Sequence, residues 1–255
     1  MKITIVTLFP QMISGFIQDS ILKRAQEKGL VEINVVQLRN FARDSYGTVD
    51  ERPYGGGAGM VICVDVLKKS LSALTQSNTH PTQRRVVLTS ARGSLFTQQK
   101  ARELAQLDEI IIYAGHYEGF DERFSACVDE ELSLGDFILT GGELAAATIC
   151  DAVVRLIPGV LKKETAVVEE SFFTIPLSTL IENIDENPHL LQLQKKGVKT
   201  VQLLEYPQYT RPEEFEGKKV PPILLSGDPK KIKKWQLQKA FEITSVRRPD
   251  LLDKK

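Results

Sequence analysis

The stretch LSLGDFILTGGELAAATICDAVVR, residues 132–155, decides the fold that we expect for this chain. Its apolar residues 137–140 predict a short strand, Gly141 and Gly142 predict a turn, and the Ala-rich run from 144 predicts a long helix. Glycines before a helix leave main-chain N–H groups open to a ligand. The plainer alternative is an ordinary strand-to-helix connection with convenient glycines. The rest of the sequence has to decide between the two.

Two predicted strands upstream end in similar loops. Residues 84–89 (RRVVLT) lead into residues 90–93 (SARG), and residues 109–114 (EIIIYA) lead into residues 115–119 (GHYEG). A segment with helical spacing, residues 97–107, lies between them. Strands that alternate with helices are typical of an α/β sheet with parallel pairs, and ligands bind at the carboxyl ends of such strands. We therefore expect the three glycine-bearing loops to form one pocket.

The amino-terminal part of the chain contains a long polar loop. Residues 2–9 and 31–38 predict strands, residues 11–28 predict one helix that ends at Gly29, and residues 65–74 predict another. Residues 40–60, NFARDSYGTVDERPYGGGAGM, are too long for a simple connector. Their glycines indicate a main chain that a ligand approaches closely, with a surface loop as the alternative. Neither a dinucleotide fingerprint nor a P-loop fits, because Met60 replaces the third glycine and no Lys-Ser or Lys-Thr follows.

Composition indicates a globular protein with a sizeable core. The chain has 255 residues, of which 42% are hydrophobic. No apolar run approaches the roughly 20 residues that span a bilayer, and the first residues lack the features of a signal peptide, so we expect a cytoplasmic protein. The cysteines and histidines are scattered, which favours buried thiols over a disulfide or metal site. They are Cys63, Cys127, Cys150, His80, His116 and His189.

Charge is distributed unevenly although the total is zero. Residues 218–255 contain 11 Lys or Arg and four acidic residues, an excess of seven positive charges that the rest of the chain balances. A helix is predicted there, with Asp228 as N-cap, Pro229 at the first position and an apolar face opposite the lysines. That face comprises Ile232, Trp235, Leu237, Ala240 and Phe241. The excess suggests a polyanionic partner, and a solvated helical face is the alternative.

Three segments describe the expected domain organisation. Residues 1–170 contain the α/β pattern, and residues 207–255 form the basic helical module. Residues 171–206 have short runs of helical spacing broken by Pro176, Pro188 and Gly197, so we expect a linker.

Several motifs in this sequence resemble those of one family, the bacterial tRNA (guanine-N1)-methyltransferases (TrmD). They are TLFP (residues 7–10), TVDERPYGGGAGM (48–60), GHYEGFDER (115–123), LGDFILTGGEL (134–144), DAVVRLIPGVL (151–161), YPQYTRP (206–212) and RRPDLL (247–252). A single Gly-Gly pair is weak evidence, but this ordered set is highly specific and covers nearly the whole chain.

The resemblance implies a fold that periodicity alone does not predict. It implies an α/β domain of the SPOUT type, with a parallel sheet and a trefoil knot, followed by a small helical domain that binds tRNA. Knots are rare in proteins. It further implies a homodimer with the active site at the subunit interface, S-adenosylmethionine as methyl donor, and N1 of the guanosine at tRNA position 37 as acceptor. Whether Mg²⁺ assists stays open.

The resemblance assigns the three loops to the donor and the long polar loop to the RNA. The implied donor-binding residues are Ser90, Gly93, Gly115, Tyr117, Glu118, Gly119, Leu134, Gly135, Asp136, Phe137, Ile138, Leu139, Thr140, Gly141 and Gly142. The implied RNA-binding residues are Asp50, Arg52, Tyr54, Gly57, Gly59, Lys233 and Lys234. The first loop matches loosely, because Ala91 and Arg92 replace the more common Pro-Gln.

The resemblance also implies the two catalytic residues. Removal of the guanine N1 proton needs a base, and the charge that gathers on the neighbouring carbonyl oxygen needs a cation. Arg155 matches the family's arginine. Glu170 stands where the family has an aspartate, and its extra methylene moves the carboxylate; Glu169 is the less favoured substitute. A long insertion between Phe172 and Leu203 is a second departure, since the family usually has a short linker there.

Two other functions remain as alternatives. A SPOUT enzyme that methylates a different RNA position would share the donor loops, but would not need TVDERPYGGGAGM or YPQYTRP. A tRNA-binding protein that has lost catalysis would keep the fold, with Glu170 and the insertion as the causes of the loss.

Overall fold

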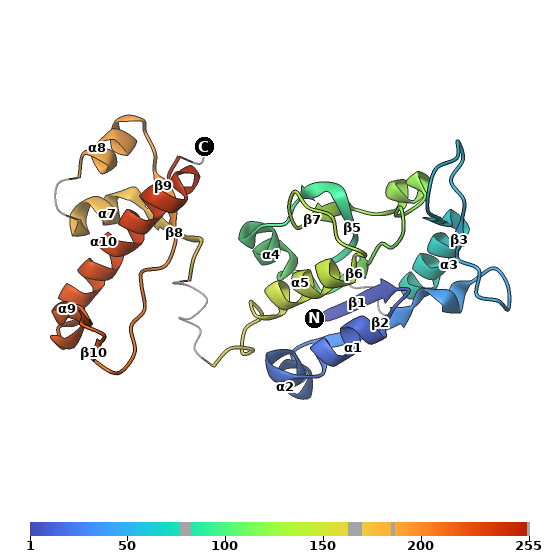
Figure 1. Ribbon diagram of the computed structural model, residues 1–255, viewed down its shortest axis with the longest axis horizontal. Coiled ribbons are helices and arrows are strands. Elements are labelled where there is room, and N and C mark those ends of the chain that lie inside the picture. Colours follow the sequence, from blue (N-terminus) through green and yellow to red (C-terminus); the bar gives the residue numbers. More distant parts are fainter. Residues whose placement is uncertain (77–82, 163–169, 185–186, 254–255) are drawn as a thin grey trace. The chain divides into compact units, whose positions relative to one another are not determined.

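The chain folds into two compact units, residues 1–162 and 163–255 (Figure 1). The structure, a computed structural model, describes residues 1–76, 83–162, 170–184 and 187–253. Glu169 and residues 77–82 lie outside the described residues. Each unit is described by itself.

A five-stranded parallel sheet forms the centre of the first unit. Its strands lie in the order β2-β1-β6-β5-β7, and every neighbouring pair is parallel. They are β1 (Lys2–Thr7), β2 (Glu32–Gln37), β5 (Arg84–Leu95), β6 (Glu109–Tyr113) and β7 (Glu130–Ser133). This arrangement confirms the expected α/β fold with a parallel sheet, whereas the knot stays a prediction.

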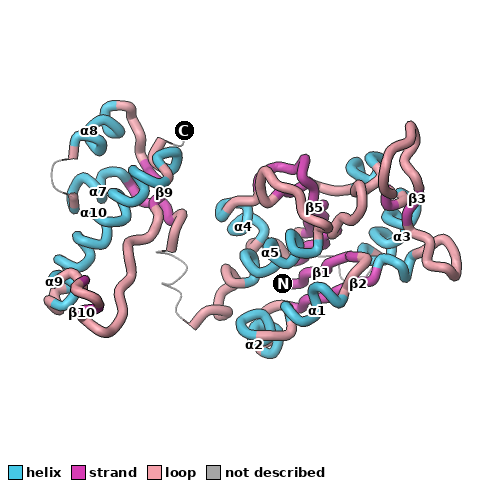
Figure 2. The backbone as a smooth tube through the Cα atoms, viewed as in Figure 1, coloured by secondary structure: helices cyan, strands magenta, loops and turns pink. Residues whose placement is uncertain are grey.

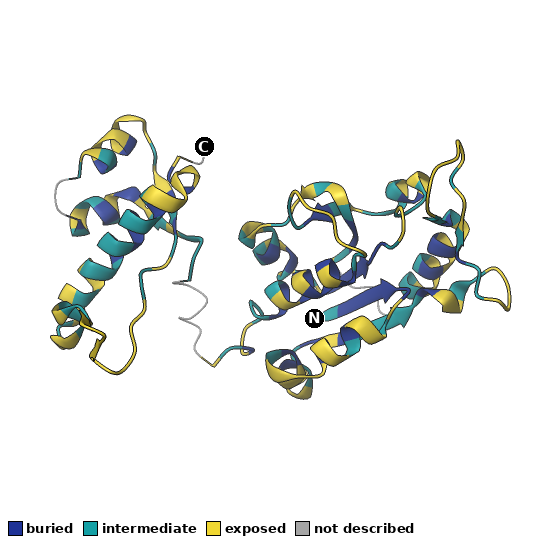
Figure 3. Cartoon of the chain, viewed as in Figure 1, coloured by how far each residue is buried: buried dark blue, intermediate teal, exposed yellow. Residues whose placement is uncertain are grey.

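Helices cover both faces of this sheet. Alternate residues of β6 point to opposite faces: Ile110 and Ile112 pack in one buried cluster, and Ile111 and Tyr113 in the other. The first cluster includes α1 (Gln11–Ile17), α2 (Ser20–Glu27), α4 (Gln98–Leu104) and α5 (Glu143–Val154), and the second includes α3 (Val64–Thr75), η1 (Leu38–Phe41) and η2 (Glu122–Cys127). Figure 3 shows the buried strands between half-exposed helices.

Two predicted elements of the first unit are wrong. Residues 11–28 form two helices, because Ser20 has a φ of 52° and the Asp19 side chain caps α2. Residues 137–140 are a loop, and the strand before it, β7, already ends at Ser133. The apolar side chains Phe137, Ile138 and Leu139 are exposed in the chain by itself, so they mimic a strand without entering the sheet.

The long polar loop contains a short hairpin. Strand β3 (Asp50–Glu51) pairs with β4 (Val61–Ile62) in antiparallel fashion, and the residues between them form the tip seen as a loop in Figure 2. In the five-stranded sheet, β5 runs on to Leu95, past the predicted end at Thr89. The pairing of β5 with β7 shifts register between Thr89 and Ser94.

The expected linker, residues 171–206, contributes several short elements to the second unit. Its short elements are β8 (Phe173–Pro176), α7 (Leu177–Asn183), α8 (Pro188–Lys195) and β9 (Thr200–Leu203), and β8 pairs with β9. Leu180, Leu193 and Leu203 share a buried cluster with Phe241. The linker interpretation is therefore wrong for this segment, because its apolar residues close one core with the carboxyl-terminal helix.

The basic helix is the longest element of the second unit. It is α10 (Pro229–Arg247), and the carboxylate of Asp228 accepts hydrogen bonds from the N–H groups of Lys230 and Lys231, which confirms the predicted cap. The other elements among its described residues are β10 (Glu214–Phe215), β11 (Lys218–Lys219), α9 (Pro222–Leu225) and η3 (Pro249–Leu251). Across the described residues, no helix combines the length and the apolar character that a membrane span requires.

Candidate active site

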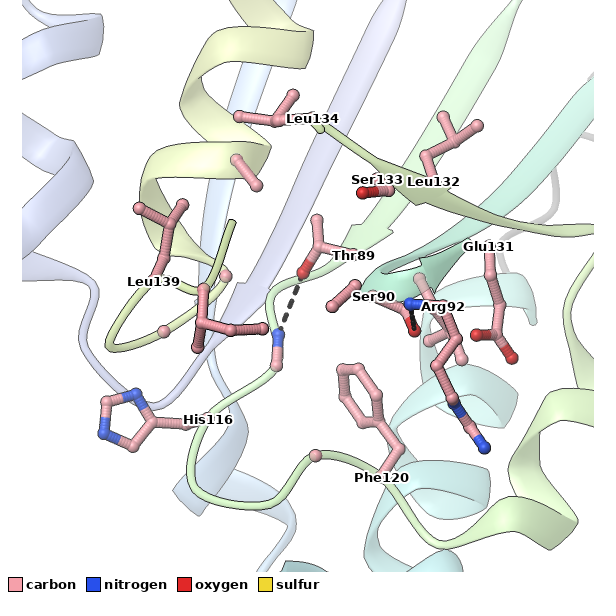
Figure 4. Close-up of a pocket in the computed structure, with 18 of the residues that line it drawn as sticks. Thr89, Ser90, Arg92, His116, Phe120, Glu131, Leu132, Ser133, Leu134 and Leu139 are labelled. Carbon is pink, nitrogen blue, oxygen red and sulfur yellow. Dashed lines mark hydrogen bonds between the residues drawn. The ribbon is translucent and has the colours of Figure 1, made fainter. Parts of the chain in front are cut away.

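A cavity of about 510 Å³ lies beside the second half of β5 and at the carboxyl ends of β6 and β7. Residues 88–92 of β5 and the loops that follow β6 and β7 line it, as Figure 4 shows for Ser90, Phe120 and Leu134. A volume of this size suits a small organic molecule. The three glycine-bearing segments therefore meet at one cavity, but the first of them, residues 90–93, is part of β5 and not the loop that the sequence predicted.

Most of the residues expected to bind the donor line this cavity. They are Ser90, Gly115, Tyr117, Glu118, Gly119, Leu134, Gly135, Phe137, Ile138, Leu139, Thr140, Gly141 and Gly142. Gly93 and Asp136 are not among its lining residues. Packing between strands explains why residue 93 is glycine. A Cβ there would lie 2.5 Å from the backbone carbon of Glu131, so only glycine lets β5 pass so close to β7.

Gly141 and Gly142 are glycines because protein packs against them. A Cβ on Gly142 would clash with Thr89 Oγ1 and would lie 2.5 Å from the Gly115 backbone nitrogen. A Cβ on Gly141 would clash with the Glu143 carboxylate and would lie 2.6 Å from His116 Nδ1. Both residues also line the cavity, but the space that a side chain would need belongs to the neighbouring loops. Access of a ligand to the main chain, which the sequence suggested as the reason for these two glycines, therefore explains them only in part.

Thr89 joins the loops and was missed by the sequence analysis. Its hydroxyl donates to the carbonyl of Tyr113 (3.2 Å) and accepts from the N–H of Gly115 (3.1 Å), and the latter bond is drawn in Figure 4. The N–H of Gly142 donates to the carbonyl of Gly115 (2.6 Å). The sequence did contain a sign of this role: Thr89 is a polar residue at the end of a predicted buried strand, and a buried hydroxyl needs hydrogen-bond partners.

Arg92, which departs from the resembled pattern, lies at the rim of the cavity. Its guanidinium pairs with the carboxylate of Glu122 at 2.8 Å, and this hydrogen bond raises the pKa of Arg92. Both side chains are largely exposed, so the pair contributes little to stability. A neighbouring pair is similar: the hydrogen bond from Arg123 lowers the pKa of Asp121.

The hairpin with the expected RNA-binding residues is hydrogen-bonded to the loop that follows β6. The N–H of Glu118 donates to the carbonyl of Met60 (3.0 Å), and the N–H of Ile62 donates to the carbonyl of Gly119 (2.9 Å). A Cβ on Gly59 would lie 2.5 Å from a carboxylate oxygen of Glu118. Tyr54, at the tip, is fully exposed. The described residues thus connect the hairpin directly to the cavity wall.

The remaining expected RNA-binding residues are spread over both units. Asp50 is half-buried, Arg52 and Gly57 are exposed on the hairpin, and Lys233 and Lys234 are exposed on α10 of the second unit.

The two expected catalytic residues belong to different units. Arg155 is half-buried at the end of α5 in the first unit, where its N–H donates to the carbonyl of Asp151 (3.2 Å). Glu170 is half-buried in the second unit, and its carbonyl accepts from the N–H of Phe173 (3.1 Å). The roles of both residues stay predictions.

The cysteines carry no sign of a metal or disulfide in the described part of the chain. Cys63 and Cys150 are buried, Cys127 is half-buried, and all three are free thiols. Burial raises the pKa of Cys63, and it raises the pKa of Cys150 to about 12. Among the described residues, no group of three or more His, Cys, Asp or Glu side chains is placed to hold a metal ion.

Large apolar side chains are exposed on the first unit. Phe9, Met12 and Phe16 lie on or next to α1, and Leu144 lies on α5; these two helices pack in one cluster. Ile138, in the third loop, is 82% exposed. Large apolar groups that stay in contact with water are typical of a surface that another molecule covers.

Comparison with known proteins gives matches along the whole chain. The model of the family described as tRNA (Guanine-1)-methyltransferase TrmD matches residues 1–254. A tRNA (guanine-N(1)-)-methyltransferase of Carboxydothermus hydrogenoformans is 45% identical over 253 residues, which cover 99% of this chain and 87% of the relative. Proteins of the same name from Dictyoglomus turgidum and Halalkalibacterium halodurans are each 44% identical over 254 residues. Those alignments cover 100% and 99% of this chain, and 91% and 92% of the relatives.

Proposed function

The chain belongs to the tRNA (guanine-1)-methyltransferase family TrmD, and on that premise we propose how its residues divide the work of methylating tRNA. As a member of this family it is an enzyme that transfers a methyl group from S-adenosylmethionine to N1 of a guanine in tRNA. We assign the acceptor to the guanosine at position 37, next to the anticodon. The observation that carries this proposal is one cavity, lined by residues 88–92 of β5 and by the loops after β6 and β7.

The cavity of the first unit is the proposed donor site. Its volume of about 510 Å³ suits a nucleoside with an amino acid attached. Main-chain groups of the loops around Gly115 and Leu139 supply hydrogen-bonding partners, and apolar side chains such as Phe120 and Leu134 supply surfaces for the adenine. The hairpin tip at Tyr54 would contact the tRNA, because it is exposed and bonded to the cavity wall.

Glu170 and Arg155 are the proposed catalytic residues. Glu170 would accept the proton from guanine N1, and the electron pair left on N1 would attack the methyl carbon. The carbon–sulfur bond then breaks and its electrons stay on sulfur, which leaves neutral S-adenosylhomocysteine. Arg155 would stabilise the negative charge that builds up on the guanine carbonyl oxygen. A divalent ion is not assigned a place in these steps.

We propose a homodimer whose interface covers the exposed apolar surface of α1, α5 and the third loop. Met12, Phe16 and Leu144 support this proposal, because burying large apolar side chains is favourable. An active site at that interface would let one subunit supply the donor and the other supply catalytic groups. The lysines of α10, with Lys233 and Lys234 exposed, would hold the phosphates of the tRNA. Action on tRNA assigns the enzyme to the cytoplasm.

Transfer of a labelled methyl group to unmodified tRNA tests the function. We expect label on guanine N1 at position 37, and no label on the same tRNA with adenosine there. Label at another base or on ribose would support the alternative SPOUT enzyme. Binding of tRNA without any transfer would support a protein that has lost catalysis.

Two substitutions test the catalytic assignment. Arg155→Ala should lower kcat about 10²–10³-fold while donor affinity survives, and Glu170→Gln should lower kcat about 10²–10⁴-fold. Full activity of the Arg155 variant would remove this residue from the mechanism. An active Glu170→Gln together with an inactive Glu169→Gln would move the base to the preceding position.

A further inference from the structure

A fully buried carboxylate stands beside the proposed donor site. Glu143, the first residue of α5, has no exposed side-chain surface. One of its oxygens accepts a hydrogen bond from Thr7 Oγ1 at 2.9 Å. The other, Oε2, is buried without a hydrogen-bond partner among the described residues. An unsatisfied carboxylate oxygen in the interior is costly, so its surroundings need an explanation.

The side chain that faces that oxygen is a histidine of the second loop. His116 Nδ1 lies 3.7 Å from Glu143 Oε2, and it too is buried without a hydrogen-bond partner among the described residues. The imidazole is held between the rings of Phe9 and Tyr117, with centroid distances of 4.6 and 4.8 Å. Two unsatisfied polar atoms therefore face each other across a short gap.

The pair connects segments that are far apart in the sequence. Thr7 ends β1, His116 belongs to the loop after β6, and Glu143 follows the Gly-Gly turn. The Thr7 hydroxyl also accepts from the N–H of Phe9 at 2.9 Å, which fixes its direction. His116 and Gly141 form a β-bridge, and a Cβ on Gly141 would enter the space between the two side chains.

We propose that Glu143 and His116 are positioning residues that hold the second and third loops together as two walls of the donor site. In this arrangement the two side chains close the 3.7 Å gap, so that Nδ1–H of His116 donates to Glu143 Oε2 and the buried carboxylate selects that tautomer. His116 lines the cavity whereas Glu143 is not among its lining residues, so Glu143 acts through His116. In Figure 4 the ring of His116 turns away from Ser90, which leaves the cavity open. This inference rests on the proposed donor site.

Four variants of the full-length enzyme test the pair: Glu143→Gln, His116→Leu, the double variant and His116→Asn. We expect Glu143→Gln and His116→Leu each to raise Kd and KM for S-adenosylmethionine about tenfold with kcat nearly unchanged. The double variant should be no worse than the poorer single variant, because coupled residues are not additive. His116→Asn should recover much of the affinity, since its amide nitrogen is placed like Nδ1.

A matched control distinguishes positioning from mere stability. Glu109 is also a nearly buried carboxylate, but it begins β6 at the opposite end of the strand and pairs with Arg84 and Lys2. Glu109→Gln should lower the melting temperature and leave KM for the donor unchanged. An equal rise in KM for this control would overturn the proposal. So would His116→Asn binding no better than His116→Leu, or effects of the two single variants that simply add.

The outcomes separate this inference from the proposed function. A wild-type enzyme that neither binds S-adenosylmethionine in calorimetry nor transfers a methyl group overturns both. A wild-type enzyme that does so, with unchanged donor affinity in the variants, overturns only the positioning pair. If Glu143→Gln does not fold, His116→Leu keeps the test decisive, because its side chain is 21% exposed and tolerates replacement better.

Discussion

Gly141 and Gly142 lie in a crowded turn, whereas Gly55, Gly56 and Gly57 lie at a hairpin tip with open space around each of them. At the turn, the neighbouring loops occupy the volume of any side chain, and Gly142 has an ordinary φ of −82°. At the tip, the three glycines have φ values of 86°, 79° and 119°, which other residues rarely adopt. One region uses glycine for packing and the other uses it for backbone conformation.

This difference assigns the two regions different work. Loops locked together by hydrogen bonds and contacts form a preorganised wall, as a donor site requires. An exposed tip with unusual backbone angles is suited to meet a large partner such as tRNA. Glycine-to-alanine substitutions, which add one methyl group, therefore test whether the two regions differ in this way. We expect the largest effect where the backbone of a neighbouring loop blocks the methyl group.

Gly142→Ala should have the largest effect. Its Cβ would meet the Gly115 backbone nitrogen at 2.5 Å, and backbone cannot move aside as a side chain can. We expect the free energy of unfolding to fall by about 1–3 kcal/mol, and donor binding to be lost. Chemical denaturation and calorimetry measure the two effects. Gly217→Ala, at a positive φ of 75° in open space of the second unit, is the control. Unchanged donor affinity in Gly142→Ala would break the comparison.

Gly59→Ala should have an intermediate effect on both ligands. This glycine belongs to the hairpin, but a Cβ there would lie 2.5 Å from the Glu118 carboxylate of the cavity wall. The flexible Glu118 side chain can move, so we expect a several-fold rise in KM for both the donor and the tRNA, with a smaller loss of stability. Steady-state kinetics with each substrate varied in turn measures this. An effect on tRNA alone would show that the two regions are not coupled at this contact.

Arg92→Ala should have the smallest effect. The pair between Arg92 and Glu122 is exposed, so its loss should change the free energy of unfolding by less than about 1 kcal/mol, and less still at high salt. Thermal denaturation at low and high ionic strength measures the difference. A large loss of donor affinity in this variant would mean that the rim, rather than the packed turn, determines binding.

The sequence predicted which segments line the cavity better than it predicted the elements around it. Residues 84–89 and 109–114 are mostly apolar and are each followed by a glycine-bearing segment, and neighbouring parallel strands bring these segments together even though the first of them continues β5. The strand at residues 137–140 was wrong because Phe137, Ile138 and Leu139 are apolar yet exposed in the chain by itself. Local patterns cannot separate residues that enter a core from residues that meet a ligand or a second subunit.

Long-range contacts explain the other differences. Strands β8 and β9 each have four residues, and Phe173 pairs with Leu203 across the whole intervening segment. So short a strand has no periodicity of its own, and the segment therefore resembled a linker. Glu143 and Thr89 were missed for the same reason, because their partners, Thr7 and Tyr113, lie elsewhere in the chain.

The most direct test of the account is a pair of calorimetric titrations with S-adenosylmethionine, one on Gly141→Ala and one on Gly56→Ala, each followed by measurement of KM for tRNA. We expect Gly141→Ala to lose donor affinity, because its Cβ displaces the side chains of Glu143 and His116. Gly56→Ala should bind the donor like the wild type and show a raised KM for tRNA alone. Wild-type donor affinity in Gly141→Ala, or an equal loss of donor affinity in Gly56→Ala, would contradict the division of work between the two regions.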